Sequence, residues 1–263
     1  MTIQTLVSCV KQNTEEIASK MNLQTDAIVI NQCDENSYRE YTYLGHKICC
    51  YSFNERGVGL SRNNALLRAT EDIILFSDED IVYEDEYAQK IIAEFEKHPD
   101  MDFLLFNMDV EESRATYHTE TETLVKWYNC GRYPTYSFAV RREKLHRNNI
   151  TFSLLFGGGA KYSNGEDSIF IRDCLKKGMK IMAVPVTIGK EVPRPSTWFN
   201  GYNEKFFFDR GVLYAYLYGK LAKPLALRFL IKHRAIMFKK EYPITMKKAY
   251  FLMKQGMQHE RSF

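Results

Sequence analysis

Residues 73–81 read Ile-Ile-Leu-Phe-Ser-Asp-Glu-Asp-Ile, an apolar run that leads directly into three carboxylates. Four apolar residues in a row are typical of a strand that is buried on both faces, as in the parallel sheet of an α/β protein. Because unpaired ionised carboxylates are costly in a core, Asp78, Glu79 and Asp80 are expected at an edge of the sheet. Ligands of open α/β sheets bind at the carboxyl ends of the strands. The segment therefore predicts an α/β fold with an acidic ligand site.

Two aspartates one residue apart can offer oxygens to one hard divalent cation, and such a cation can hold a diphosphate. This spacing favours a metal-dependent enzyme that acts on a nucleotide-linked substrate. An acidic helix cap is the alternative at this point, since Glu84, Asp85 and Glu86 follow closely.

The order of the predicted elements also indicates an α/β protein. Strand patterns alternate with helical patterns along the first half of the chain, and this alternation argues for a mostly parallel sheet. We expect Ser61 or Gly59 to open the second helix and Pro185 to end the last strand. The predicted strands are residues 5–10, 26–30, 47–51, 72–76, 102–107, 136–140 and 180–184, and the predicted helices are 13–20, 60–69, 83–97 and 168–177.

Composition bounds the class of protein. With 45% hydrophobic and 26% charged residues over 263 positions, the chain has the make-up of an ordinary globular protein. Its six cysteines form no Cys-x-x-Cys pair, which disfavours a zinc site and suits a reducing, cytoplasmic compartment. We expect no signal peptide, and no apolar run approaches the roughly 20 residues needed to span a bilayer.

The net charge of +3 hides an asymmetry between the two ends of the chain. Residues 211–263 carry 11 Lys or Arg against 2 Asp or Glu, so the rest of the chain is acidic. From residue 203 onward the pattern is helical, and basic residues alternate with apolar ones, which predicts helices lying on an anionic membrane surface. The alternatives are an apolar face packed on the rest of the protein, or nucleic-acid binding, for which no recognised motif is present.

A second motif precedes the acidic strand end: residues 56–63 read Arg-Gly-Val-Gly-Leu-Ser-Arg-Asn. The pair of motifs resembles family 2 glycosyltransferases of the GT-A fold, of the type that assembles bacterial polysaccharides, over roughly residues 3–200. Members carry an R-G-x-S-x-x-R-N-like segment before the strand that ends in D-x-D. The matching residues here are Arg56, Gly57, Ser61, Arg62 and Asn63, followed by Asp78 and Asp80.

The resemblance implies a nucleotide-sugar site that uses Mn²⁺ or Mg²⁺. Asp80 is similar to the aspartate that binds the metal directly, and Asp78 to the one that reaches the ribose or the metal. Arg62 is similar to the arginine that faces the nucleotide, and Glu79 lies between the two aspartates. The third metal ligand is not evident, because no histidine lies between residues 146 and 233, and Glu191 is one possible substitute.

The part of the site that binds the base departs from the family pattern. Members commonly end the second strand with an aspartate that hydrogen-bonds uracil, whereas Asn31 and Gln32 stand here and offer amide groups instead. At the end of the first strand, Ser8 and Val10 occupy the place where the family makes backbone contacts to the base. A UDP-sugar is the expected donor.

The turn at Gly165 delivers two carboxylates, Glu166 and Asp167, to the start of a helix. Capping of the helix dipole would explain one acid at this place. In the resembling family an E-D pair supplies the general base, which implies Asp167 as the base and Glu166 as a ligand of acceptor hydroxyls or an orienting residue. The helix dipole is expected to keep Asp167 ionised.

Two further places are candidates for acceptor binding. Gly158 and Gly159 belong to a run of three glycines whose backbone amides can approach a sugar or phosphate closely. Trp198 could stack on the face of a sugar ring or pin the C-terminal helices.

Taken together, these features predict a GT-A domain over residues 1–202, with a nucleotide-sugar half at 1–110 and an acceptor half at 111–202. Residues 203–263 form a basic amphipathic helical extension. The expected activity is inverting, metal-dependent transfer of a sugar to a hydroxyl of a glycan acceptor, carried on a polyprenyl diphosphate, at the inner face of the cell membrane. The alternatives are a sugar-nucleotide nucleotidyltransferase and a non-catalytic, membrane-associated assembly partner.

Overall fold

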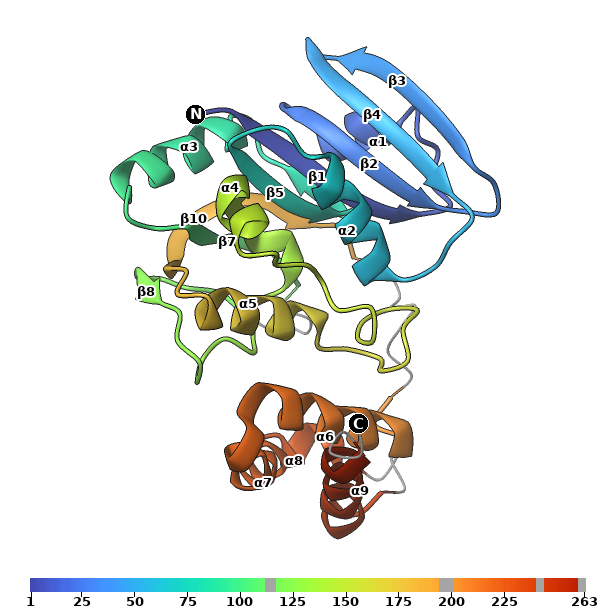
Figure 1. Ribbon diagram of the computed structural model, residues 1–263, viewed down its shortest axis with the longest axis vertical. Helices are drawn as coiled ribbons and strands as arrows, with labels where there is room; N and C mark the ends of the chain where they lie inside the picture. Colours follow the sequence, from blue (N-terminus) through green and yellow to red (C-terminus); the bar gives the residue numbers. More distant parts are fainter. Residues whose placement is uncertain (112–116, 194–200, 240–243, 260–263) are drawn as a thin grey trace.

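The computed structural model describes residues 1–111, 117–193, 201–239 and 244–259. Figure 1 shows a large sheet domain and, below it, a lobe of C-terminal helices. The strands are β1 (Ile3–Val10), β2 (Asp26–Gln32), β3 (Ser37–Tyr43), β4 (His46–Phe53), β5 (Ile73–Asp78), β6 (Ile81–Tyr83), β7 (Phe103–Asp109), β8 (Thr123–Leu124), β9 (Phe138–Arg141) and β10 (Ile181–Glu191). The helices of the sheet domain are α1 (Ile17–Met21), α2 (Val58–Arg68), α3 (Tyr87–Lys97), α4 (Arg142–Arg147) and α5 (Glu166–Lys176), with a short 3₁₀ turn η1 (Thr135–Ser137).

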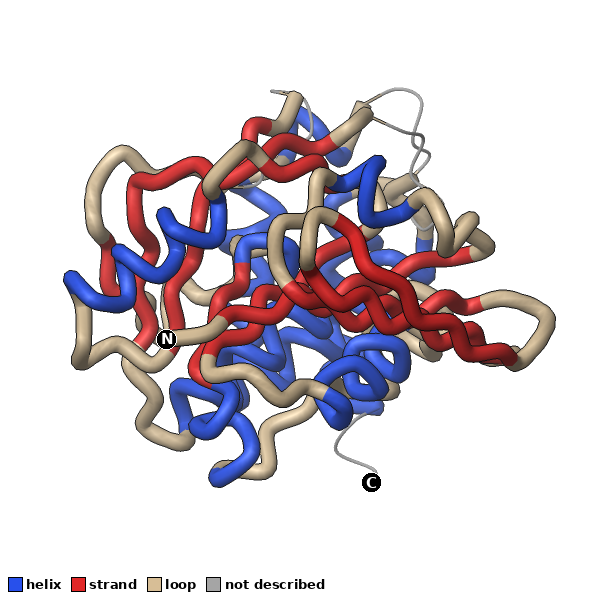
Figure 2. The backbone as a smooth tube through the Cα atoms, turned by 90° about the horizontal axis from the view of Figure 1, so that it is seen from above, coloured by secondary structure: helices blue, strands red, loops and turns tan. Residues whose placement is uncertain are grey.

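All the strands belong to one sheet, whose order is β3-β4-β2-β1-β5-β9-β7-β10-β6, with β8 paired to β10. Strands β4, β2, β1 and β5 are parallel neighbours, and β9 runs antiparallel between β5 and β7. Seen from above, the strands form a twisted band across the molecule (Figure 2). The predicted α/β fold with a largely parallel central sheet is therefore confirmed.

Side chains of the central strands alternate between two buried layers, as the two-residue period of a strand requires. Leu75 packs with α1 and α3 in one layer, whereas Ile74 and Phe76 pack with α2, α4 and α5 in the other. The carboxyl ends of β1, β2, β4 and β5 meet at one edge, and β5 ends there at Asp78, opposite Ser8 of β1. This edge is where the predicted ligand site lies.

Several element boundaries differ from the sequence-based expectations. Helix α2 is capped by Gly57, two residues before the expected Gly59, because glycine adopts the φ of +127° that this turn requires. Strand β10 does not end at Pro185. It continues to Glu191, with a register shift between Ala183 and Thr187 that places the proline in a bulge, where it need not donate a hydrogen bond.

The C-terminal lobe contains α6 (Glu204–Tyr218), the turn η2 (Gly219–Leu221), α7 (Ala222–Lys232), α8 (Arg234–Met237) and α9 (Met246–His259). Pro224 does not interrupt the helix, because it lies in the first turn of α7, where an amide hydrogen is not needed. Helices α6 and α9 cross at two glycines: a Cβ at Gly211 would lie 2.1 Å from the carbonyl oxygen of Met253, and one at Gly256 would lie 2.1 Å from that of Phe208. Only glycine permits this close crossing.

The lobe packs against the sheet domain through α6. Val212, Leu213 and Leu217 share a buried cluster with Phe156 and Ile169, so at least part of the extension's apolar surface covers α5 and the loop before it. Of the possibilities for the extension, packing of an apolar face on the rest of the protein is thus observed for α6. No helix within the described residues is long and apolar enough to cross a membrane.

Candidate active site

A single buried arginine joins the two acidic motifs that lie about 90 residues apart in the sequence. Arg62, in the second turn of α2, is only 4% exposed. Its Nη1 lies 3.1 Å from Oε1 of Glu166 and 3.2 Å from Oδ1 of Asp167, and its Nη2 lies 3.1 Å from Oδ1 of Asp78. The start of α5 and the end of β5 are thereby held at the same edge of the sheet.

The electrostatics of this cluster are unbalanced, since one guanidinium faces three carboxylates. Burial acts to lower the pKa of Arg62, but the charges of Asp78, Asp167 and Glu166 outweigh it and raise the pKa well above its usual range. The guanidinium carbon also lies 5.3 Å from the centre of the Phe152 ring. Its Nε is buried and, among the described residues, has no hydrogen-bond partner. Arg62 is therefore a permanent cation at the centre of the site.

Asp167 occupies an environment that opposes its ionisation. Burial and the neighbouring charge of Glu166 raise the pKa of its carboxyl group, while Arg62 and the hydroxyl of Thr135 act in the other direction. The expectation that the helix dipole keeps this group ionised is wrong in sign, because desolvation and the like charge outweigh the dipole. Arg62 and Thr135 both donate to Oδ1. Within the described residues no hydrogen bond reaches Oδ2, which is the oxygen able to accept a proton.

Glu166 is held more completely than Asp167. Its Oε1 accepts from Arg62, and its Oε2 accepts from the backbone amide of Gly165 at 3.1 Å. The side chain is 12% exposed, and a Cβ at Gly157 would lie 2.9 Å from its carboxyl carbon. The glycine loop thus packs directly against this carboxylate.

Asp80 and Glu79 lie on the turn between β5 and β6. Oε2 of Glu79 accepts a hydrogen bond of 2.5 Å from the amide of Val10, so the acidic turn is tied to the end of β1. The carbonyl of Asp80 accepts from the amide of Val192 at 2.7 Å, and Glu191 pairs with Ile81 across the β10–β6 ladder. A fourth carboxylate residue, Glu191, therefore adjoins the turn that carries Asp78, Glu79 and Asp80.

The donor set at this turn suits a hard divalent cation. Mg²⁺ is usually held by one or two carboxylates together with substrate phosphates, and Asp80 and Asp78 supply carboxylates. Asp78 shares its oxygens with Arg62 at 3.1 and 3.4 Å, so a bound cation would share this carboxylate with the guanidinium. The residues present fit Mn²⁺ or Mg²⁺.

A different group of metal-ligand type lies at the far end of α3. Ligand atoms of Glu94, His98 and Glu122 all lie within 4.8 Å of one another. The ammonium of Lys97 lies 2.6 Å from Glu122 and 3.8 Å from Glu94, so a lysine already supplies the positive charge there. We interpret this group as an ion-pair network.

The side chains predicted to bind the base make hydrogen bonds within the protein. Asn31 accepts from the amide of Gln12 at 3.1 Å and donates to its carbonyl at 3.2 Å. Gln32 accepts from the amide of Gly57 at 2.7 Å. Ser8 receives a hydrogen bond of 3.0 Å from the hydroxyl of Ser61. These hydrogen bonds brace the loops that follow β1 and β2 at the edge of the sheet, and contacts of these residues to a base remain predictions.

At the rim of the same side, Asp34 pairs with Lys11 at 2.6 Å and with Arg56. Hydrogen bonds from Lys11, and secondly from Arg56, lower the pKa of the Asp34 carboxyl group. Arg56, the first arginine of the sequence motif, therefore lies on the surface, away from the buried cluster around Arg62.

Sequence reasoning missed two residues of the site, both in η1. Thr135 donates its hydroxyl to Asp167. Burial raises the pKa of Tyr136, and the charges of Glu191, Asp78, Asp167 and Asp80 raise it further, so this phenol feels the charge of the acidic site. The segment was predicted as the start of a strand. Its only local signal is Pro134, which begins the turn.

Of the three residues predicted to bind the acceptor, Gly158 and Gly159 lie within the described part of the chain. The carbonyl of Gly158 accepts from the amide of Val58 at 2.9 Å, and a Cβ at Gly159 would lie 3.1 Å from the nitrogen of Gly57. The glycine loop is therefore packed on the start of α2, beside the cluster. Trp198 lies outside the described residues.

Comparison with known proteins identifies the fold and the family. The sequence profile of Glycosyl transferase family 2 matches residues 3–158, and no curated protein matches the sequence. The structure of S. aureus TarS residues 1–349 in complex with UDP-GlcNAc aligns with a TM-score of 0.66 and 15% identity, over 96% of this chain and 79% of that one. The mannosyltransferase PcManGT from Pyrobaculum calidifontis, in complex with GDP-Man and Mn²⁺, aligns with a TM-score of 0.51 and 13% identity, over 98% and 75% of the two chains.

These structural matches share the GT-A glycosyltransferase fold with the present chain. The family profile covers more than half of the sequence, including both the Arg62 motif and the D-x-D turn. The chain therefore belongs to glycosyl transferase family 2.

Proposed function

We propose that this glycosyltransferase is metal-dependent and inverting, and that it moves a sugar from a UDP-sugar to a hydroxyl of a glycan acceptor. The observation that carries this proposal is the meeting of Asp78, Glu166 and Asp167 on Arg62, beside the Asp80 turn. In this proposal Asp78 and Asp80 form the donor and metal side of the site, and Glu166 and Asp167 form the acceptor side.

On the donor side, Asp80 and Asp78 would hold Mn²⁺ or Mg²⁺. The ion would neutralise the diphosphate as it leaves. A TarS structure in complex with UDP supports the choice of uridine nucleotides for this chain, although PcManGT carries GDP-Man. Glu79 steadies the turn by accepting from Val10, and Arg62 offsets part of the negative charge that the three carboxylates would otherwise present to a diphosphate.

On the acceptor side, Asp167 would act as the general base. The acceptor oxygen attacks the anomeric carbon, its proton passes to Oδ2 of Asp167, and the bond from that carbon to the diphosphate breaks. The products are an inverted glycoside and the nucleoside diphosphate. Because the pKa of Asp167 is raised, the carboxylate is a stronger base than an ordinary aspartate, and this favours proton transfer near neutral pH. Glu166 would contact acceptor hydroxyls.

We further propose that the acceptor is lipid-linked and that the C-terminal lobe binds the inner face of the membrane. Residues 219–239 contain six Lys or Arg and no Asp or Glu. Leu227, Ile231 and Ile236 are 41–54% exposed on the same segment. Juxtaposed basic and exposed apolar side chains suit a surface of anionic lipids. The basic residues are Lys220, Lys223, Arg228, Lys232, Arg234 and Lys239.

The proposal is tested by thermal unfolding with a panel of nucleotide sugars, each with and without Mn²⁺. A ligand that binds the native state raises its stability according to its occupancy. We expect stabilisation by one nucleotide family only when Mn²⁺ is present, and none for Asp80→Asn. If no donor stabilises the folded protein, the chain is better explained as a non-catalytic partner in glycan assembly.

A further inference from the structure

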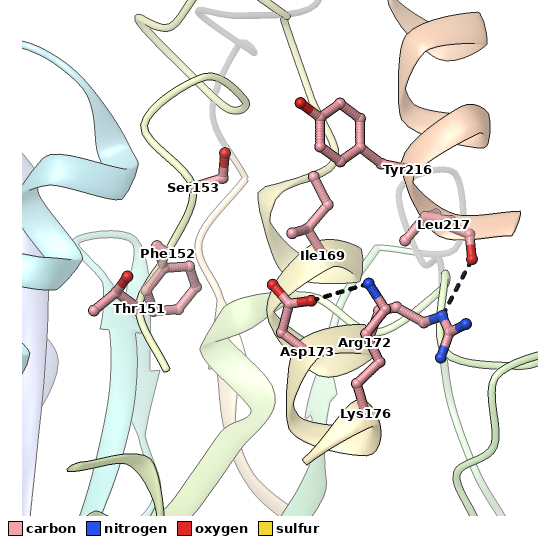
Figure 3. A pocket seen from close by; sticks show the side chains of 9 residues that line it. All are labelled: Thr151, Phe152, Ser153, Ile169, Arg172, Asp173, Lys176, Tyr216 and Leu217. Carbon is pink, nitrogen blue, oxygen red and sulfur yellow. Dashed lines mark hydrogen bonds and ion pairs between the residues drawn. The ribbon is translucent and has the colours of Figure 1, made fainter. Parts of the chain in front are cut away.

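A pocket of about 360 Å³ lies between α5, the segment 151–153 and the last turn of α6 (Figure 3). Its floor is apolar, because Phe152, Ile169 and Leu217 are buried. Its wall is polar and combines hydroxyl, carboxylate and cationic groups. The polar lining residues are Thr151, Ser153, Arg172, Asp173, Lys176 and Tyr216. The sheet domain and the C-terminal lobe each supply part of the wall.

The charged groups of this wall are only loosely engaged with one another. Lys176 and Asp173 are 3.6 Å apart, with side chains 52% and 42% exposed, and Figure 3 shows the two side chains pointing toward each other. Arg172 donates from Nε to the carbonyl of Leu217 at 3.1 Å, which fixes α6 against α5. Tyr216 is 41% exposed and presents a ring and a hydroxyl.

This combination selects for a sugar among common ligands. A sugar ring has apolar C–H faces, which pair with an aromatic ring and an apolar floor, and a rim of hydroxyls, which pair with carboxylate, ammonium and hydroxyl groups. A cavity of this size is at the lower end of the range for small-molecule sites. A nucleotide is disfavoured, because Asp173 cancels one of the two positive charges that a diphosphate would need.

The pocket continues the face of α5 that begins with the catalytic motif. Glu166, Ile169, Asp173 and Lys176 recur at intervals of three and four residues, so they lie on one face of the helix. The rise from Glu166 to Asp173 is roughly 10 Å. A single sugar cannot fill both places, because the loop 153–157 lies between them: Gly157 packs on Glu166, and the Phe156 ring lies 5.3 Å from that of Tyr216.

We infer that this pocket binds a sugar unit of the acceptor glycan other than the one whose hydroxyl reacts. The inference rests on the proposed function, since it assumes a glycan acceptor. It gives the C-terminal lobe a part in substrate recognition, through Tyr216 and Leu217, that is separate from any contact with a membrane. It also implies an acceptor of at least two sugar units.

The test uses saturation-transfer NMR on the full chain, with the methyl glycosides of glucose, galactose, N-acetylglucosamine and glucuronic acid as probes. Thr151→Trp fills the pocket from an exposed position, and Tyr216→Ala removes its aromatic wall. Lys177→Trp adds the same bulk at an exposed position directly after α5, outside the pocket, and is the matched control. We expect at least one probe to bind and its affinity to fall by about tenfold or more in the two pocket variants only.

Two results would overturn the inference: no probe binds the wild-type protein, or binding survives in Thr151→Trp. If Tyr216→Ala fails to fold, Asp173→Asn replaces it, because this change alters one polar group without removing packing. Hydrolysis of the donor in the absence of acceptor separates the two proposals. Thr151→Trp should hydrolyse the donor at the wild-type rate. If the wild-type protein itself does not hydrolyse any donor, that result contradicts the proposed function but does not test sugar binding in the pocket.

Discussion

Leu213 of α6 packs directly on Gly165, the residue that precedes the two candidate catalytic carboxylates. A Cβ at Gly165 would lie 2.5 Å from Cδ1 of Leu213, and the glycine has a φ of +116°. The turn that delivers Glu166 and Asp167 is thus shaped both by its own backbone and by a side chain from the C-terminal lobe.

This contact predicts that Gly165→Ala lowers the free energy of unfolding by more than backbone strain at a positive φ would by itself. Gly178→Ala is the matched control, because Gly178 also has a positive φ, of +78°, but nothing lies within 4 Å of its Cβ position. We expect about 1 kcal/mol for the control and about 1–3 kcal/mol more for Gly165→Ala, since overpacking adds to backbone strain. Urea unfolding measures both. Leu213→Ala should partly restore the stability of Gly165→Ala. Equal losses of unfolding free energy in Gly165→Ala and Gly178→Ala would argue against the steric contact.

Replacing Arg62 by methionine should destabilise the protein by about 3–5 kcal/mol, because three partly buried carboxylates then lose their cation. The loss should shrink as the pH falls, since protonated carboxyl groups do not need a counter-charge. Arg68→Met is the control, because Arg68 lies on the same helix and packs its guanidinium 4.7 Å from the Tyr51 ring, and no ion pair joins it to a carboxylate in the described part of the chain. Similar losses for both variants, measured by chemical unfolding, would contradict the central role of Arg62.

Asp167→Asn should lower sugar transfer by about 10²–10⁴-fold while donor binding stays near the wild-type level, because the change removes a base but not the donor site. Initial-rate assays and donor titrations measure the two quantities separately. Asp100→Asn, on the surface at the opposite edge of the sheet, should alter neither. Normal turnover in Asp167→Asn would show that another group accepts the proton.

The raised pKa of Asp167 predicts the acidic limb of the pH–rate profile. A base must be unprotonated, so the rate falls as the pH drops through its pKa, and the limb should lie well above pH ~4, the ordinary value for aspartate. Thr135→Val removes a hydrogen bond that lowers this pKa, so the limb should move to higher pH. Thr42→Val, on the edge strand β3, should leave it in place. A limb near pH ~4 in the wild type would contradict the environment described for Asp167.

The raised pKa of Asp167 also predicts how stability depends on pH, and here the dependence is opposite: the rate rises with pH, whereas the free energy of unfolding falls. Because the folded-state pKa of Asp167 is raised, its contribution favours the folded protein at low pH and is lost as the pH rises through that pKa. Asp167→Asn should therefore flatten the decline of the unfolding free energy across this pH range. Chemical unfolding at several pH values measures the slope.

Membrane binding should depend on the charges of α7. Changing Lys223, Arg228 and Lys232 to glutamate should abolish co-sedimentation with vesicles that contain phosphatidylglycerol, since each basic residue near such a surface contributes about 1 kcal/mol. The same net change on the sheet domain, at Lys20, Lys47 and Lys90, should have little effect, because these exposed lysines form only surface ion pairs. Equal binding of both triple variants would show that the lobe does not direct the contact.

The sequence was informative where side-chain type decides burial. The run ending at Asp78 forms the central strand β5, and the overall order of strands and helices follows the predicted α/β pattern. The sequence was uninformative where backbone hydrogen bonding, and not side-chain type, decides the structure. Strand β3 has no apolar run, and its first four residues are exposed, so only its ladder with β4 identifies it.

The site was predictable to the extent that acidic residues follow recognisable motifs. Nothing in the sequence indicated that Arg62 would join Asp78 to Asp167, because that contact depends on how α2 and α5 pack on the same layer of the sheet. Thr135 and Tyr136 were missed for the same reason. A 3₁₀ turn places them in the site, and turns of this kind carry little periodic signal.

The crossing of α6 and α9 at Gly211 and Gly256 has a consequence for biosynthesis. Backbone contacts between these helices set the position of α6, and α6 in turn supplies Leu213 beside Gly165 and Tyr216 in the pocket. A nascent chain that has already folded its sheet still lacks this support until residues 246–259 leave the ribosome. The pocket that contains Tyr216 would then take its final form only after the strand edge with Asp78 has been synthesised and folded.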